Sequence, residues 1–172
     1  MALCNEMSFD LNMVSKAFRS FKGVKRRQEI LSSHNNIWVI EDFAHHPTSV
    51  KMSIEAVKKR FSKVHALFEP RSATSRRKIF QDDYVDAFLK ADSVWIAKPF
   101  DQEKIVESDR FSSQELVEAL NTKGVKAQTF SNAYEILEPL KELVKPNEAI
   151  LIMSNGSFDG IYQQIVDMSL NH

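Results

Sequence analysis

The sequence predicts an α/β fold, built on a mostly parallel open sheet with helices on both faces and one antiparallel edge strand. Strand-like and helix-like segments alternate along most of the chain. Two of the strand-like segments, residues 64–68 and 149–153, are almost continuously apolar, which is typical of parallel strands covered on both faces. We therefore expect a Rossmann-like arrangement in which helices connect neighbouring parallel strands by right-handed crossovers.

The chain opens with a predicted amphipathic helix over residues 8–21. Its apolar residues recur on one stripe, Ser8 is placed to cap the first turn, and Gly23 ends the helix. Two extended segments follow, residues 27–32 and 37–42, separated by the turn-forming residues SHNN. The first of these segments is expected to be the edge strand, paired antiparallel with the second.

The remaining elements continue the alternation. Pro47 suits the first turn of a helix, where its missing N–H costs nothing. The sequence SSQE at residues 112–115 is a capping box, and Gly124 suits a helix C-terminus. The expected elements are a helix over 47–61, a strand over 64–68, a helix over 79–91, a strand over 93–97, a helix between Ser112 and Gly124, a strand over 127–130, a helix from Ser131 disturbed at Pro139, a strand over 149–153 and a helix over 158–170.

Length and composition favour one soluble domain with a short extra segment. The formal net charge of zero argues against nucleic acid as a partner. A single cysteine, Cys4, allows no internal disulfide and fits a reducing compartment. No apolar run is long enough to span a bilayer, and the N-terminus lacks a signal-peptide core, so a cytoplasmic location is expected.

Candidate binding residues follow the predicted strands directly. In open parallel sheets, ligands bind outside the carboxyl ends of the strands. Asp42 ends one strand and could hold a ribose hydroxyl or cap a turn. Arg71 follows the next strand, where its guanidinium could bind a carboxylate or a phosphate. Residues 154–157 form the turn after the last strand. We expect the three loops that follow these strands to lie together at one edge of the sheet, which we call the rim.

The adjacent histidines His45 and His46 do not predict a metal site. Adjacent residues share neither a helix face nor a strand face, and no other ligand stands at a suitable spacing. We expect one of the two histidines to cap the following helix and the other to face solvent.

The sequence lacks the glycine-rich loops that hold nucleotide phosphates. It contains neither G-x-x-x-x-G-K-[ST] nor G-x-G-x-x-G, and it has only four glycines. Such a sheet could hold part of a nucleotide, but it has no phosphate cradle of its own. Composition and spacing go no further than an α/β domain with a polar rim.

Four segments resemble the C-terminal domain of Mur ligases. These are FKGVKRRQE at residues 21–29, EDFAHHPT at 41–48, EPRS at 69–72 and MSNGSF at 153–158. The second segment resembles its counterpart in the Mur ligases that use UDP-N-acetylmuramate as acceptor. The last two segments resemble those of the murein peptide ligases within that group. The chain departs from the peptide-ligase pattern at Ala73, Ser157, Asp159 and Tyr162.

The resemblance implies an ATP-driven ligation that serves cell-wall biogenesis and peptidoglycan recycling. The carboxylate of UDP-N-acetylmuramate would be phosphorylated and then attacked by the amine of L-alanyl-γ-D-glutamyl-meso-diaminopimelate. Residues 23–172 would form the C-terminal domain, and residues 1–22 a helix that links it to a central ATPase domain. That domain would hold most of the ATP and Mg²⁺, so we expect the chain to be inactive without the upstream domains.

The resemblance also assigns roles to individual residues, and no residue to a metal. The expected catalytic contact to the γ-phosphate is Arg27, the ATP contacts are Asp42, Phe43 and His46, and the peptide contacts are Arg71, Ser154 and Asn155.

Other functions remain open on the sequence alone. The chain could be the corresponding domain of a UDP-N-acetylmuramate–L-alanine ligase, although that enzyme usually has Gln-Pro-His-Arg where this chain has residues 69–72. It could also be a non-catalytic module that binds a small anion or a peptide on the same rim. The absent glycine-rich fingerprints argue against a nucleotide enzyme of another family.

Overall fold

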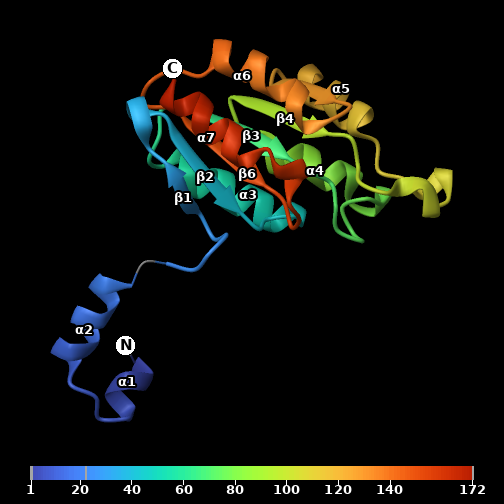
Figure 1. Cartoon of the computed structure of the whole chain (residues 1–172). Coiled ribbons are helices and arrows are strands. Elements are labelled where there is room, and N and C mark those ends of the chain that lie inside the picture. The colour runs from blue at the N-terminus through green and yellow to red at the C-terminus, as the bar shows by residue number, and fades with distance from the viewer. Residues whose placement is uncertain (1, 22, 172) are drawn as a thin grey trace.

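The computed structural model describes residues 2–21 and 23–171, and its centre is a six-stranded sheet (Figure 1). The strand order is β1-β2-β6-β3-β4-β5. β1 pairs antiparallel with β2 and the other neighbours pair in parallel, as predicted. The predicted boundary at Lys22 lies outside the described residues, as do Met1 and His172. The strands are β1 (Glu29–Ser32), β2 (Trp38–Asp42), β3 (Val64–Phe68), β4 (Ser93–Ala97), β5 (Lys126–Phe130) and β6 (Ala149–Met153).

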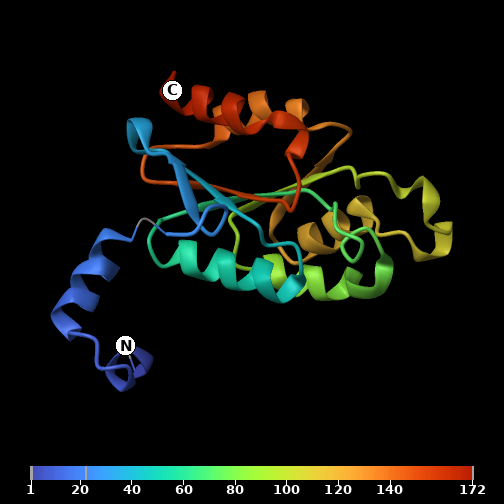
Figure 2. The same ribbon diagram turned by 60° about the horizontal axis from the view of Figure 1, so that its bottom comes forward.

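Helices cover both faces of the sheet, which confirms the predicted α/β class. α3 (Pro47–Lys58), α4 (Gln81–Phe88) and α5 (Ser113–Thr122) pack on one face, and α6 (Leu137–Leu143) and α7 (Tyr162–Leu170) on the other (Figure 2). Each face has its own cluster of buried apolar residues. β3, β4 and β6 are buried along their whole length, as parallel central strands require.

Two short N-terminal helices stand apart from this body in both views. They are α1 (Ala2–Glu6) and α2 (Leu11–Ser20), and neither has a buried residue. The predicted Ser8 cap is wrong, because Asp10 accepts a hydrogen bond from the N–H of Asn12 and Ser8 has a left-handed φ of 56°. The apolar stripe exists, but large side chains such as Phe18 and Phe21 remain about 60% exposed.

Several predicted elements are shorter in the structure, for local reasons. β1 begins at Glu29 because Arg26 and Gln28 adopt left-handed φ angles of 57° and 51°, which no strand tolerates. Positive φ at Phe158 and Asp159 similarly delays α7 to Tyr162, after a short 3-10 turn. The segments before α4 and α6 are also 3-10 turns. Pro139 lies in the first turn of α6, where its ring is tolerated.

A chain of buried polar side chains links the amino ends of three strands, opposite the rim. Ser93 accepts from the indole N–H of Trp95 at 2.8 Å, and lies 2.8 Å from Nδ1 of His65. Nε2 of His65 lies 2.8 Å from Glu148, which also pairs with Lys63 at 3.1 Å. Every group is satisfied if Ser93 donates to His65 and His65 donates to Glu148.

This network predicts that part of the domain's stability depends on the charge of Glu148. Burial alone would raise the pKa of Glu148, but hydrogen bonds from His65, Lys63 and the N–H of Lys145 lower it overall. A lowered pKa contributes stability above the unfolded value of about 4.3, which is lost as the pH falls through the folded value. We expect Glu148→Gln to cost about 2 kcal/mol of unfolding free energy at pH 7, and less near pH 3.

Urea unfolding of both chains at the two pH values measures this difference. Glu55→Gln is the matched control, because Glu55 pairs with Lys90 at 2.9 Å on the exposed surface and should change the unfolding free energy little. An equal cost of Glu148→Gln at pH 7 and pH 3 would contradict the role of its charge.

Candidate active site

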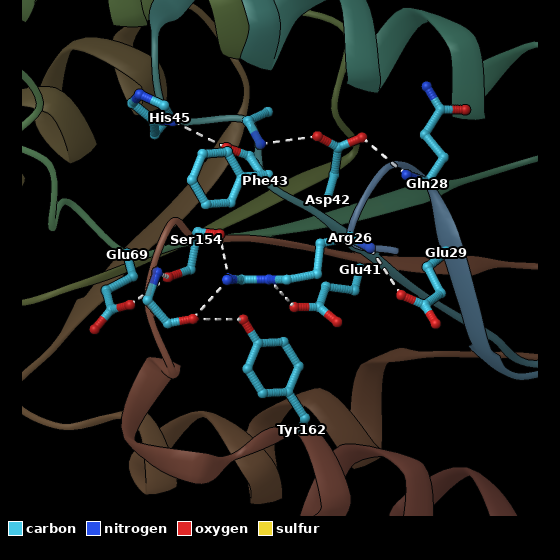
Figure 3. A network of polar contacts seen from close by, with 12 residues as sticks. Arg26, Gln28, Glu29, Glu41, Asp42, Phe43, His45, Glu69, Ser154 and Tyr162 are labelled. Carbon is cyan, nitrogen blue, oxygen red and sulfur yellow. Dashed lines mark hydrogen bonds and ion pairs between the residues drawn. The ribbon is translucent and has the colours of Figure 1, made fainter. Parts of the chain in front are cut away.

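The loops that carry the predicted site residues meet at one edge of the sheet. β6 lies between β2 and β3, and the three strands end in register, since Met153 is level with Asp42 and with Phe68. The residues that follow these strands are therefore neighbours, although more than 80 positions separate Glu69 from Ser154. Figure 3 shows the resulting polar network.

Asp42 is buried, and its carboxylate accepts hydrogen bonds from two backbone N–H groups nearby. One oxygen accepts from the N–H of Ala44 at 2.8 Å, and the other accepts from the N–H of Gln28 at 3.1 Å (Figure 3). The structure thus places Asp42 as a turn cap, one of the two interpretations the sequence left open. Carboxylate oxygens can accept more than one hydrogen bond, so contact with a ribose stays a prediction.

Phe43 and the arginine pair before β1 lie together. The guanidinium carbons of Arg26 and Arg27 lie 5.1 and 5.4 Å from the centre of the Phe43 ring. Arg27 is exposed, and Phe43 is half-buried. The structure therefore brings an exposed cation and an aromatic surface to the same part of the rim.

The two histidines differ in their contacts. Nδ1 of His46 accepts from the N–H of Thr48 at 3.4 Å and caps α3, and its ring lies 4.7 Å from that of Phe80. One of the two thus caps the helix, as predicted. His45 is half-buried instead of facing solvent, with Nδ1 2.9 Å from the carbonyl oxygen of Phe43. No group of three or more acidic, histidine or cysteine side chains suited to a metal occurs in the described part of the chain.

Arg71 is held in place on three sides. Its Nη1 donates to Glu69 at 3.2 Å, and its guanidinium stacks on Phe100 at 3.9 Å. Gly156 forms the third side, because a Cβ at that position would lie only 2.0 Å from Cδ of Arg71. A guanidinium fixed in this way loses little conformational entropy when it binds a carboxylate.

Glu69 is a buried side chain that links Arg71 to the turn after β6. It is only 3% exposed, and it accepts hydrogen bonds from the hydroxyl of Ser154 and from Arg71. The Ser154 hydroxyl also accepts from the N–H of Gly156 at 2.8 Å. Next to it, the side-chain oxygen of Asn155 is buried and has no hydrogen-bond partner within the described chain.

Several residues of the network, among them Arg26, Glu69 and Tyr162, were not predicted as site residues. Glu69 and Arg26 lay within the quoted motifs without a role, and Tyr162 was named only as a departure from the peptide-ligase pattern. Burial, with a further contribution from Glu41, raises the pKa of Tyr162 to about 12, so its hydroxyl stays protonated. A carboxylate directly after a continuously apolar strand was the one sequence signal that could have singled out Glu69.

None of the helices among the described residues combines the length and the apolar character needed to cross a bilayer.

The chain spans about a third of the length of the curated relatives it matches. It is 33% identical over 88% of its length to a UDP-N-acetylmuramate–L-alanyl-γ-D-glutamyl-meso-2,6-diaminoheptandioate ligase of Haemophilus influenzae, covering 32% of that protein. It is equally identical, over 90% of its length, to a UDP-N-acetylmuramate–L-alanine ligase of Clostridium botulinum, covering 34% of it.

Solved structures show the same architecture. A murein peptide ligase from Psychrobacter arcticus matches with a TM-score of 0.73 and 28% identity, over 99% of this chain and 35% of that one. A domain from a peptide ligase of Haemophilus ducreyi matches with a TM-score of 0.64 and 29% identity, over 83% of this chain and 99% of the domain. Residues 26–156, which include all seven predicted site residues, match the model of the Mur ligase glutamate ligase domain, and the chain therefore belongs to the Mur ligase family.

Proposed function

We propose that this chain is the C-terminal domain of an ATP-dependent ligase that joins L-alanyl-γ-D-glutamyl-meso-diaminopimelate to UDP-N-acetylmuramate. The observation that carries the proposal is Arg71, fixed by Glu69, Phe100 and Gly156 beside the Ser154 turn. A peptide with several carboxylates is the kind of substrate that a preorganised guanidinium suits. The reaction would belong to peptidoglycan recycling in the cytoplasm.

The two halves of the rim would serve different substrates. Arg27 would contact the γ-phosphate, where a delocalised cation stabilises the charge that develops during transfer. Asp42, Phe43 and His46 would hold the ribose and the adenine, a role that the Phe43 ring beside Arg27 supports. ATP would supply the phosphoryl group that activates the carboxylate. Mg²⁺ is assigned to the upstream domain and to no residue of this chain.

The peptide would occupy the other half of the rim, which is formed by Arg71, Ser154 and Asn155. Arg71 would bind one of its carboxylates, and Ser154 and Asn155 would contact its polar backbone. The buried side-chain oxygen of Asn155 supports this role, because an unsatisfied buried acceptor is costly unless a donor reaches it in some state of the protein. Closure against the upstream domain would exclude water from the reactive intermediate.

We infer that residues 1–22 connect the domain to the rest of the enzyme. α1 and α2 have no buried residue, and a hollow of about 440 Å³ between them is lined by Cys4, Phe9, Val14, Ala17, Phe18 and Phe21. An exposed apolar surface of this kind is typical of a contact with another protein surface. The span of this chain, about a third of its relatives, leaves room for the domain that would cover it.

The substrate is tested by competition in the complete ligase. Equal concentrations of L-alanine and the tripeptide are offered with ATP and UDP-N-acetylmuramate, and the amide products are separated by mass. We expect the tripeptide product to dominate. Dominance of the alanine product would instead favour the L-alanine ligase, which the similarity to the C. botulinum enzyme also allows. Absence of both products would favour a non-catalytic binding module.

A further inference from the structure

Arg26 connects the two halves of the rim through a single guanidinium. Its Nε donates to Glu41 on β2 at 2.7 Å. Its Nη2 donates to the carbonyl oxygens of Ser154 and Gly156, at 2.9 and 2.7 Å, in the turn after β6 (Figure 3). Two of these three hydrogen bonds thus hold a turn that lies about 130 residues away in sequence.

The backbone of Arg26 is anchored as firmly as its side chain. Its N–H donates to Glu29 at 2.7 Å, and its carbonyl oxygen accepts from the N–H of Phe43 at 2.8 Å. These contacts hold a left-handed φ of 57°, a conformation that is unfavourable for a residue with a side chain. Strained residues of this kind persist where the surroundings over-determine them, and they are concentrated at functional sites.

The turn held by Arg26 is also the wall against which Arg71 packs. A Cβ on Gly156 would meet Cδ and Nε of Arg71 at 2.0 and 2.2 Å, so the Gly156 backbone and the Arg71 side chain touch. The same turn carries Ser154, whose hydroxyl contacts the Glu69 that holds Arg71. A displacement of the turn would therefore displace Arg71.

We propose that Arg26 is a positioning residue for the peptide half of the site, although it is next to Arg27 in the nucleotide half. Arg26 acts by fixing the turn over residues 154–156, and through it the guanidinium of Arg71. The proposal rests on the proposed function, because it takes Arg71 as the contact to the peptide. Lysine cannot replace Arg26, since an ammonium lacks the planar fork that reaches Glu41 and two carbonyl groups together.

The first arm of the test uses hydrogen exchange in this chain. In Arg26→Lys, the Gly156 amide should exchange about tenfold faster, while core amides of β3 and β6 keep their protection. Arg60→Lys is the matched control, because Arg60 lies 5.4 Å from the Phe61 ring on the exposed surface away from the rim. Unchanged exchange at Gly156 in Arg26→Lys would overturn the proposal. If that variant loses core protection, Glu41→Ala, which removes one hydrogen-bond partner of the guanidinium, should give the same local effect.

The second arm uses kinetics in the complete ligase. Arg26→Lys should raise the Michaelis constant for the tripeptide about tenfold and leave that for ATP within about twofold. In the double variant with Arg71→Ala, the Michaelis constant for the tripeptide should be nearly that of Arg71→Ala alone, because the two residues act through the same contact. Additive effects, or a larger change for ATP than for the tripeptide, would refute the assignment.

These measurements distinguish a failure of the Arg26 inference from a failure of the proposed function. If Arg71→Ala raises the peptide constant and Arg26→Lys does not, the Arg26 inference is wrong and the proposed function stands. If Arg71→Ala leaves the peptide constant unchanged, the proposed function loses its support, and the exchange of Gly156 still decides whether Arg26 fixes the turn.

Discussion

The 172-residue chain alone is expected to form no amide product from ATP, UDP-N-acetylmuramate and the tripeptide. Its sequence has no G-x-x-x-x-G-K-[ST] loop, and backbone N–H groups of such a loop are what cradle the phosphates in P-loop enzymes. Without such a loop, we expect the exposed Arg27 and the Phe43 ring to offer ATP only a weak site. Product is measured by mass spectrometry and phosphate release, and turnover at the rate of a complete ligase would contradict the expectation.

A chain that begins at Gly23 provides the control for folding. α1 and α2 have no buried residue, so removing them should leave the melting temperature of the remaining domain unchanged. This shorter chain should also be less prone to self-association, because the apolar hollow between the two helices is gone. A large fall in melting temperature would show instead that residues 1–22 belong to the folded body.

Arg71→Ala in the complete ligase is expected to raise the Michaelis constant for the tripeptide roughly 100-fold, or by about 2.7 kcal/mol. The substitution removes the guanidinium proposed to bind a substrate carboxylate. It also leaves the buried Glu69 carboxylate with the Ser154 hydroxyl as its only side-chain donor among residues 2–21 and 23–171. The constant for ATP should change far less, because Arg71 lies on the other half of the rim. Steady-state kinetics with each substrate varied in turn measures the two effects.

Arg71→Lys separates charge from geometry in the same assay. Lysine keeps the positive charge but cannot stack flat on Phe100 or bind a carboxylate through two parallel N–H groups, so we expect it to recover only part of the loss. An unchanged peptide constant in Arg71→Ala would remove Arg71 from the substrate site.

The sequence predicted the sheet well because the residues of each central strand identify it without reference to the rest of the chain. The strands over 64–68, 93–97 and 149–153 match the structure residue for residue, since each is a nearly continuous apolar run bounded by turn residues. Pro47 and Ser112 start helices for local chemical reasons, and both starts are confirmed. The common rim of Asp42, Arg71 and Ser154 followed from the parallel direction of their strands.

The sequence could not predict which side chains hold the site together. Arg26 received no role from its sequence because its partners, Ser154 and Gly156, are brought to it only by the folded sheet. Glu69 received no role because its burial and its contact with Ser154 depend on the neighbouring strand. Left-handed backbone at Gln28 and Asp159 shortened two elements, and nothing in the residue types there demanded it.

The most direct test of the shared active site is reconstitution from separate parts. The purified upstream domains are mixed with this chain, ATP, Mg²⁺, UDP-N-acetylmuramate and the tripeptide, and the amide product is followed by mass spectrometry. We expect product only when both parts are present, and much less when the chain carries Arg71→Ala. Product from the upstream domains alone, or none from the mixture of folded parts, would contradict the view that the rim of this chain supplies half of the active site.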